Sequence, residues 1–91
     1  MKVRTVVTIK GLVQGMAFRH HTVQKAQQHK VYGWVKNLAN GEVQGCFEGD
    51  EQDVKALIDW CRKGPSRARV DTVQVDMEDY SGEFSCFEIK Y

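Results

Sequence analysis

The pair Asn40-Gly41, near the middle of the 91-residue chain, is the feature that most restricts its fold. Asn-Gly tolerates the positive backbone angles of a tight hairpin turn. It separates two segments with strand-like patterns, Tyr32–Asn37 and Glu42–Glu48. Because a hairpin makes its two strands antiparallel, the centre of the chain predicts a β-hairpin around which both ends must be arranged.

The hydrophobic pattern changes its period in the residues before this hairpin. Residues 3–10 alternate between two faces, which is the period of a strand. Gly11 and Gly15 then bracket a short loop. From Phe18 to about Lys30 there is no Gly or Pro, and apolar residues recur at helical spacing. We therefore expect a strand, a loop and a helix ahead of the hairpin.

A second helix is the clearest element after the hairpin. Asp50 stands at its N-cap position, and Lys63-Gly64-Pro65 ends it. Its apolar residues fall at i, i+3, i+4 and i+7; they are Val54, Leu57, Ile58 and Cys61. A further strand is expected near residues 69–77. Alternating Phe87, Ile89 and Tyr91 predict a short last strand.

The order of elements is therefore strand, helix, strand, strand, helix, strand, with a short extra strand at the end. This order predicts an α+β fold in a single domain, residues 1–91: a ferredoxin-like βαββαβ sandwich. Two helices would pack on one face of a mainly antiparallel sheet. The fold alone does not identify an activity, because this architecture is found in enzymes, metal carriers and RNA-binding domains alike.

Composition excludes some classes of function. Thirteen basic and twelve acidic residues give a formal net charge of +1, which provides no overall field for nucleic acid or an anionic membrane. No apolar run approaches the roughly 20 residues that span a bilayer. The charged N-terminal residues Lys2 and Arg4 are unlike a signal peptide. We therefore expect a cytoplasmic protein that binds neither membrane nor nucleic acid.

The cysteines point to the same compartment. Cys46, Cys61 and Cys86 are odd in number and form no C-x-x-C pair, a pattern that suits reducing conditions. Sequence alone leaves one disulfide open. We expect each cysteine to serve as a small buried apolar side chain. Trp34, Trp60 and Phe87 are also expected in the core, since large aromatics dominate protein cores.

The loop that begins at Gly11 has the chemistry of an anion site. A short loop entering a helix directs several backbone N–H groups, here those of residues 13–18, towards one point at the positive end of the helix dipole. Arg19 just inside the helix adds a planar fork of donors. No G-x-G-x-x-G motif occurs, and no Lys-Ser or Lys-Thr follows Gly15. By itself this pattern is more often a plain connector than a phosphate site.

Motifs along nearly the whole chain resemble the acylphosphatase family. They occur in the family's order and at its spacing: Gly11-Leu12-Val13-Gln14-Gly15-Met16-Ala17-Phe18-Arg19, Gly33-Trp34-Val35-Lys36-Asn37, Asn40-Gly41, Lys63-Gly64-Pro65-Ser66-Arg67-Ala68-Arg69-Val70 and the aromatic-rich close at residues 87–91. The sequence departs from the pattern at Met16-Ala17, where many relatives carry Val-Gly or Val-Cys, and at Leu12, where a polar residue is common. If this site needs a left-handed backbone, Ala17 would be strained by about 1 kcal/mol or more.

The resemblance implies hydrolysis of carboxyl-phosphate bonds without a metal or other cofactor. It assigns the catalytic roles to Arg19, which would hold the phosphoryl oxygens, and Asn37, which would hold the attacking water. The implied phosphate-binding residues are Val13, Gln14, Gly15, Met16, Ala17, Phe18 and Arg19. We expect a monomer that acts on small-molecule acyl phosphates, binds inorganic phosphate and tolerates varied acyl groups.

The sequence offers three rival functions. His20, His21 and His29 lack metal-site spacing, so we expect helix-surface or partly buried histidines. An RNA-binding sheet would carry aromatics in a basic motif on central strands, but the first strand has no aromatic residue. A silent phosphate-binding module on the same fold is the closest rival. The presence of both Arg19 and Asn37 favours the enzyme.

Overall fold

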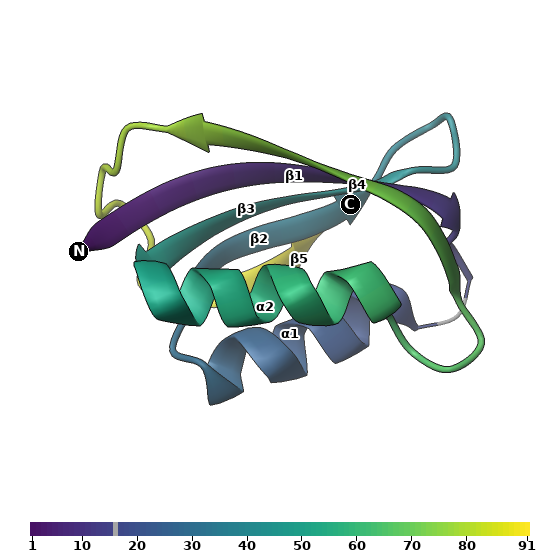
Figure 1. Ribbon diagram of the computed structural model, residues 1–91, viewed down its shortest axis with the longest axis horizontal. Coiled ribbons are helices and arrows are strands. Elements are labelled where there is room, and N and C mark those ends of the chain that lie inside the picture. The colour runs from purple at the N-terminus through teal and green to yellow at the C-terminus, as the bar shows by residue number, and fades with distance from the viewer. Residues whose placement is uncertain (16) are drawn as a thin grey trace.

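The sheet and its helices have the predicted ferredoxin-like α+β architecture. The structure, a computed structural model, describes residues 1–15 and 17–91. The elements of these residues, in chain order, are β1 Lys2–Leu12, α1 Phe18–Gln28, β2 Tyr32–Asn37, β3 Val43–Asp50, α2 Glu51–Lys63, β4 Arg69–Glu78 and β5 Phe87–Lys90. The strands form one sheet in the order β4-β1-β3-β2-β5. Helices α1 and α2 cover one face of it (Figure 1). Among the described residues, no helix is long and apolar enough to cross a membrane.

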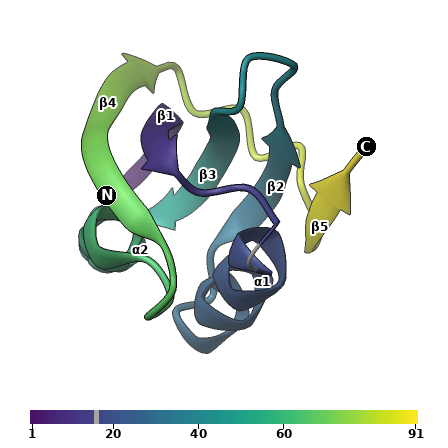
Figure 2. The same ribbon diagram turned by 90° about the vertical axis from the view of Figure 1, so that its right-hand side faces the viewer.

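The sheet is antiparallel except at one edge. β1 lies between β3 and β4, antiparallel to both, and β3 is also antiparallel to β2 through the predicted hairpin. β5 is parallel to β2 and forms the short extra strand at the edge. The connection from β4 to β5 therefore runs from one edge of the sheet to the other, as Figure 2 shows. This arrangement brings the end of the chain next to the end of β2.

Most element boundaries agree with the sequence pattern, but β1 continues through Gly11 to Leu12, two residues that were expected in the loop. These residues pair with Val70 and Arg69 of β4, which extends the strand. β2 has the predicted bounds, whereas β3 begins at Val43 and continues to Asp50, because Asp50 pairs with Lys2 at the start of β1. Asp50 occupies the N-cap position of α2, but its side chain makes no capping hydrogen bond to a described residue. Its carboxylate lies 3.5 Å from the Lys2 ammonium group instead.

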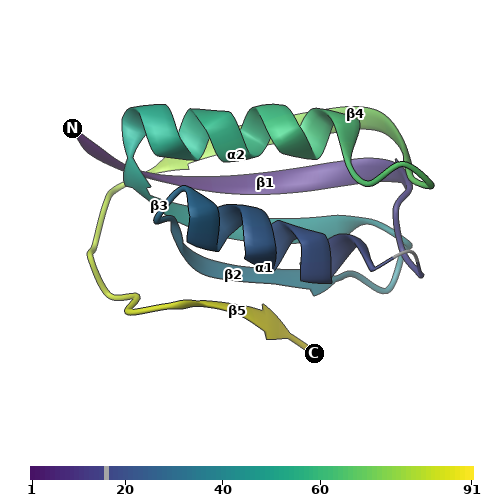
Figure 3. The same ribbon diagram turned by 90° about the horizontal axis from the view of Figure 1, so that it is seen from below.

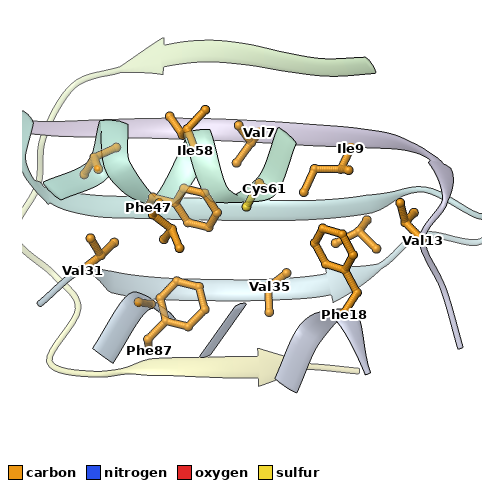
Figure 4. Close-up of a cluster of buried hydrophobic side chains, with 14 of the residues drawn as sticks. Val7, Ile9, Val13, Phe18, Val31, Val35, Phe47, Ile58, Cys61 and Phe87 are labelled. Carbon is orange, nitrogen blue, oxygen red and sulfur yellow. The ribbon is translucent and has the colours of Figure 1, made fainter. Parts of the chain in front are cut away.

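The core lies between the sheet and the helices (Figure 4). β1 alternates as predicted: Val3, Val7 and Ile9 are buried among core residues. α2 buries the predicted stripe, which consists of Val54, Leu57, Ile58 and Cys61. Full burial of one such aliphatic side chain contributes about 1.5–3 kcal/mol. The two periodicities therefore determine which faces meet.

The face of the sheet without helices departs from one expectation. Trp34 was expected in the core, and this is wrong: it is half-buried and shares the helix-free face with Tyr32 and Lys36. The Lys36 and Lys90 ammonium groups lie 5.2 and 5.0 Å from the centre of its ring. The sequence pattern of β2 does not say which of its faces the helices cover, so Trp34 was misassigned. Phe87 is buried and Trp60 packs against the core, as expected.

The cysteines are free, and two of them behave as predicted. Cys46 and Cys61 are buried, and burial raises the pKa of the Cys61 thiol to about 12. Burial also raises the pKa of Cys46, although the nearby Arg4 charge opposes that shift. Cys86 is exposed, so the expectation of a buried apolar role is wrong for this residue. It directly precedes β5, where the chain arrives at the sheet edge.

Candidate active site

The loop between β1 and α1 lies at the end of the molecule where β2 also ends. In Figure 3 the start of α1, the arrowhead of β2 and the C-terminal residue all lie towards the same end. Helix α1 packs against both β2 and β5. The predicted phosphate loop and the predicted water-binding residue Asn37 therefore belong to neighbouring elements at one end of the fold.

Both ends of the loop are anchored in the core, while its middle is open. Val13 and Phe18 are 1% and 2% exposed, and the Phe18 ring packs against Trp60 at a centroid distance of 5.6 Å. Between them, Gly15 has a φ of 83°, and a Cβ added there would meet no atom within 4 Å. The chain thus turns at Gly15 with its backbone facing open space. Met16, one of the predicted phosphate-binding residues, lies outside the described residues.

Ala17 has a left-handed backbone conformation, which glycine would adopt more easily. Its φ and ψ are 57° and 26°, and it is the N-cap residue of α1. This conformation costs a residue with a Cβ about 1–2 kcal/mol. Its carbonyl oxygen still accepts a hydrogen bond from the backbone N–H of His21, 3.0 Å away. The sequence analysis predicted strain at Ala17 if its backbone were left-handed. The backbone is left-handed, so Ala17 is a strained residue at the start of the helix.

The partial positive charge of the helix dipole at the first turn of α1 is not neutralised by an acidic side chain among the described residues. In the described residues, no side chain caps this helix and no acidic residue lies in its first turn. Helix α2 differs, because Glu51 and Asp53 lie in its first turn. Unpaired N–H groups and an uncompensated helix dipole favour a bound anion. The start of α1 is therefore the better suited of these two helix ends to hold a phosphoryl group.

Arg19 stands in this first turn and is half-buried. Its guanidinium carbon lies 5.1 Å from the centre of the Tyr91 ring. None of the ion pairs formed within residues 1–15 and 17–91 involves Arg19. A contact with an aromatic ring uses no hydrogen-bond donor, so the planar fork of N–H groups is still able to bind an oxyanion.

Asn37 is the last residue of β2 and points to the helix-covered side of the sheet. It follows Val35 and Gly33 at the strand period of two, and both of these are buried under the helices. Its Oδ1 atom is buried and accepts no hydrogen bond from any described residue. An unpaired buried acceptor costs about 1–3 kcal/mol. Stability alone therefore gives no reason for an asparagine here.

The register of β5 connects Asn37 with Arg19. Lys36 pairs with Lys90 in the parallel ladder, and Asn37 and Tyr91 are the residues that directly follow them. Asn37 is the last residue of β2, and Tyr91 lies just beyond the end of β5. Tyr91 in turn has its ring against the Arg19 guanidinium. Asn37, Tyr91 and Arg19 are thus gathered at one corner of the molecule. The chemical roles of Arg19 and Asn37 stay predictions.

A second connection joins the loop to the hairpin that follows Asn37. The Gln14 side-chain amide donates hydrogen bonds to the carbonyl oxygens of Leu38 and Glu42, at 2.8 and 2.9 Å. These two carbonyls lie on opposite sides of the β2–β3 turn. One side chain therefore joins the predicted phosphate loop to both sides of the β2–β3 turn.

Sequence reasoning did not find the tertiary roles of Gln14 and Tyr91. Gln14 is predicted to bind phosphate only through its backbone amide. No local sequence pattern indicates that its side chain contacts Leu38, which is 24 positions further along the chain. For Tyr91, the alternation with Phe87 and Ile89 indicated its face but not its neighbour. The histidines behave as predicted: His20 and His21 are exposed, and His29 is half-buried on the C-cap of α1.

Comparisons with known proteins agree on one family. The family model described as Acylphosphatase matches residues 5–89. An acylphosphatase of Geobacter sulfurreducens is 66% identical over 91 residues, covering 100% of both chains. An acylphosphatase of Geobacter metallireducens is 64% identical, over 100% of this chain and 98% of the relative. The crystal structure of acylphosphatase from Bacillus subtilis superposes with a TM-score of 0.94 at 27% identity, covering 98% of this chain and 99% of that one.

Proposed function

The chain belongs to the acylphosphatase family, whose activity is the hydrolysis of acyl phosphates, and we propose that Arg19, the loop amides and Asn37 carry this reaction here. The observation that supports the proposal is the position of Tyr91, whose ring lies against the Arg19 guanidinium and which follows the residue that pairs with Lys36, next to Asn37 in the chain. The products are a carboxylate and inorganic phosphate. Met16 would contribute to the same loop.

The phosphoryl group would be held by the start of α1. Backbone N–H groups of residues 13–18 and the Arg19 guanidinium supply donors for its peripheral oxygens. Val13 and Phe18, which are buried in the core, would hold the two ends of this loop in place before the substrate arrives. Preorganised donors stabilise charge in the transition state without paying for reorganisation during the reaction.

Asn37 would position the attacking water. An amide does not titrate in the useful range, so Asn37 orients the water with its carbonyl and NH₂ groups and removes no proton. Its unpaired Oδ1 is an acceptor with no competing partner among the described residues. The proton of the water would pass to a phosphoryl oxygen of the substrate. Attack in line with the leaving group then completes the displacement.

Few groups are needed because the substrate is an activated anhydride. Its leaving carboxylate is a weak base and departs without a strong general acid. The remaining tasks are alignment of water and neutralisation of charge, which the residues above can perform. We therefore expect hydrolysis that needs no metal. We also expect a monomer acting on small-molecule acyl phosphates in the cytoplasm, a compartment compatible with three free cysteines.

A hydrolysis assay tests the proposal. Release of carboxylate and phosphate from acetyl phosphate and benzoyl phosphate should be rapid in the presence of a chelator. Inorganic phosphate should inhibit competitively, since it would occupy the same cradle. Loss of turnover on chelation would contradict the metal-free mechanism. Phosphate binding without turnover would show instead a silent phosphate-binding module.

A further inference from the structure

Tyr91 is an aromatic residue whose position calls for an explanation. Its side chain is 96% exposed, while the other helix-side residues of the same segment, Phe87 and Ile89, are buried and half-buried. Burial in the core therefore contributes almost nothing to keeping an aromatic residue here. The contact that the structure does give its ring is with Arg19, at 5.1 Å. Exposed contacts of this kind contribute little to stability.

The position of the ring relates directly to the proposed phosphate site. Tyr91 follows Lys90, which pairs with Lys36, so the chain leaves β5 at Tyr91 close to the end of β2, where Asn37 lies. Arg19 would hold the phosphoryl group, and the acyl group is joined to that phosphorus through a single oxygen. An acyl group that leaves the phosphorus on the Tyr91 side of Arg19 would lie within a few ångströms of the ring, which is 5.1 Å from the guanidinium. The ring offers exposed apolar surface on that side.

We propose that the Tyr91 ring binds the acyl group of the substrate and favours acyl phosphates with an aryl or other bulky apolar group over those with a methyl group. This inference rests on the proposed function, because it needs the phosphoryl group to be held by Arg19. The loop amides and Arg19 recognise the part common to all substrates. Tyr91 then supplies the surface that distinguishes one acyl group from another.

The expected size of the effect follows from the chemistry of aromatic contacts. Offset or edge-to-face packing of two rings adds to the simple burial of area, whereas a methyl group offers little surface to a ring. Discrimination by one partly exposed apolar contact is modest, and we expect roughly 3- to 10-fold in kcat/KM between benzoyl and acetyl groups. The contribution is a preference within a broad substrate range.

A purely positioning role for Tyr91 predicts a different result. If the ring only held Arg19 in place, its removal would weaken phosphoryl binding for every substrate alike. The ratio of kcat/KM for benzoyl phosphate to that for acetyl phosphate would then be unchanged. This ratio separates the two roles, and the inhibition constant of inorganic phosphate adds a second measure, because phosphate has no acyl group.

The experiment compares both substrates across three variants of the full chain. In Tyr91→Ala, the ratio of kcat/KM for benzoyl over acetyl phosphate should fall by roughly 3- to 10-fold, with phosphate inhibition nearly constant. Tyr91→Phe should keep the ratio, since the ring is retained. Tyr80→Ala removes another exposed aromatic residue, on the connection between β4 and β5, and should leave the ratio unchanged.

Two outcomes overturn the inference. One is an equal loss for both substrates in Tyr91→Ala, and the other is no change for either. The failure of the proposed function would look different, because the unmodified protein would then hydrolyse neither substrate. Circular dichroism of each variant controls for unfolding. Because Tyr91 is exposed, its replacement should leave the fold intact.

Discussion

The Gln14 side-chain amide lies 2.8 Å from the carbonyl oxygen of Leu38, the residue that directly follows Asn37. The same amide nitrogen also donates to the Glu42 carbonyl at 2.9 Å. Gln14 belongs to the predicted phosphate loop, whereas Leu38 and Glu42 lie in the β2–β3 turn. This side chain therefore links the predicted loop directly to the residue after the proposed water-binding Asn37.

Replacing Gln14 with leucine should impair catalysis more than folding. Both carbonyls have a second donor, since the backbone N–H groups of Gly41 and Leu38 also bond to them, so neither is left unpaired. We expect a loss of about 1 kcal/mol in the free energy of unfolding. Misplacement of the loop relative to Asn37 should lower kcat/KM by roughly 10-fold or more. Urea denaturation and benzoyl phosphate kinetics measure the two effects.

The matched control for Gln14→Leu is Gln24→Leu, on the exposed face of α1. It should change neither quantity measurably. A Gln14→Leu protein with unaltered kinetics would contradict the positioning role.

Replacing Arg19 with lysine should abolish most of the activity. The charge is retained, but the planar fork that binds two oxygens at once is lost. We expect kcat/KM to fall by at least about 100-fold, the size found when one preorganised donor is removed from an oxyanion site. Arg67→Lys, at an exposed position, should have normal kinetics. Near-normal turnover in Arg19→Lys would rule out bidentate binding.

Replacing Asn37 with alanine should remove turnover without loss of stability. Its Oδ1 is buried and unpaired among the described residues, so deletion relieves an acceptor that costs about 1–3 kcal/mol when unsatisfied. We expect an unfolding free energy equal to or above that of the parent. Inorganic phosphate should still bind, because the cradle is intact. Calorimetric titration with phosphate and the hydrolysis assay check both points.

Asn40→Ala is the matched control, and it should have the opposite effects to Asn37→Ala on stability and turnover. The side-chain Oδ1 of Asn40 accepts a hydrogen bond from the Glu42 backbone N–H at 3.1 Å, within the turn. Its loss should lower the unfolding free energy by about 1 kcal/mol and leave turnover largely unaffected. Full hydrolysis by the Asn37→Ala protein would refute the role assigned to Asn37.

Replacing Ala17 with glycine should stabilise the protein. Glycine adopts the φ of 57° without the strain that a Cβ brings, although its unfolded chain has more freedom to lose. The balance of these terms gives an expected gain of roughly 0.5–1 kcal/mol. Thermal or urea unfolding measures it. Ala17→Val should shift stability in the opposite direction, since a β-branched residue tolerates this conformation less well.

The thiols should react in a fixed order. Cys86 is exposed, whereas Cys46 and Cys61 are buried. At pH 8, a thiol reagent should modify one cysteine per folded chain quickly and three after denaturation. Rapid labelling of Cys61 in the folded protein would show that α2 opens readily.

The raised pKa of Cys61 also predicts a stability change at high pH. Burial raises this pKa to about 12, so the folded state keeps the thiol protonated where the unfolded chain would lose the proton. Its contribution to stability is therefore intact below the unfolded pKa and declines as the pH rises from there towards 12. Cys61→Ala should lessen this alkaline decline in urea midpoints.

The sequence by itself determined the elements and which residues share a face of each element. The Asn40-Gly41 turn, the alternation in residues 3–10 and the helical stripe of α2 are local, because each period follows from the backbone geometry of one element. The loop before α1 and the importance of Arg19 and Asn37 were predicted from the motifs that the sequence shares with the family. Strain at Ala17 was predicted on the condition that this position of the family motif has a left-handed backbone.

The tertiary structure alone decided which of these local features meet. Tyr91 lies beside Asn37 only because β5 pairs with β2 in one particular register, and residues that are 54 positions apart carry no local signal of that register. The same holds for the side chain of Gln14 and for the face on which Trp34 lies. Hydrogen bonding between distant strands selects among arrangements that have equal local patterns. That selection formed the corner shared by Arg19, Tyr91 and Asn37.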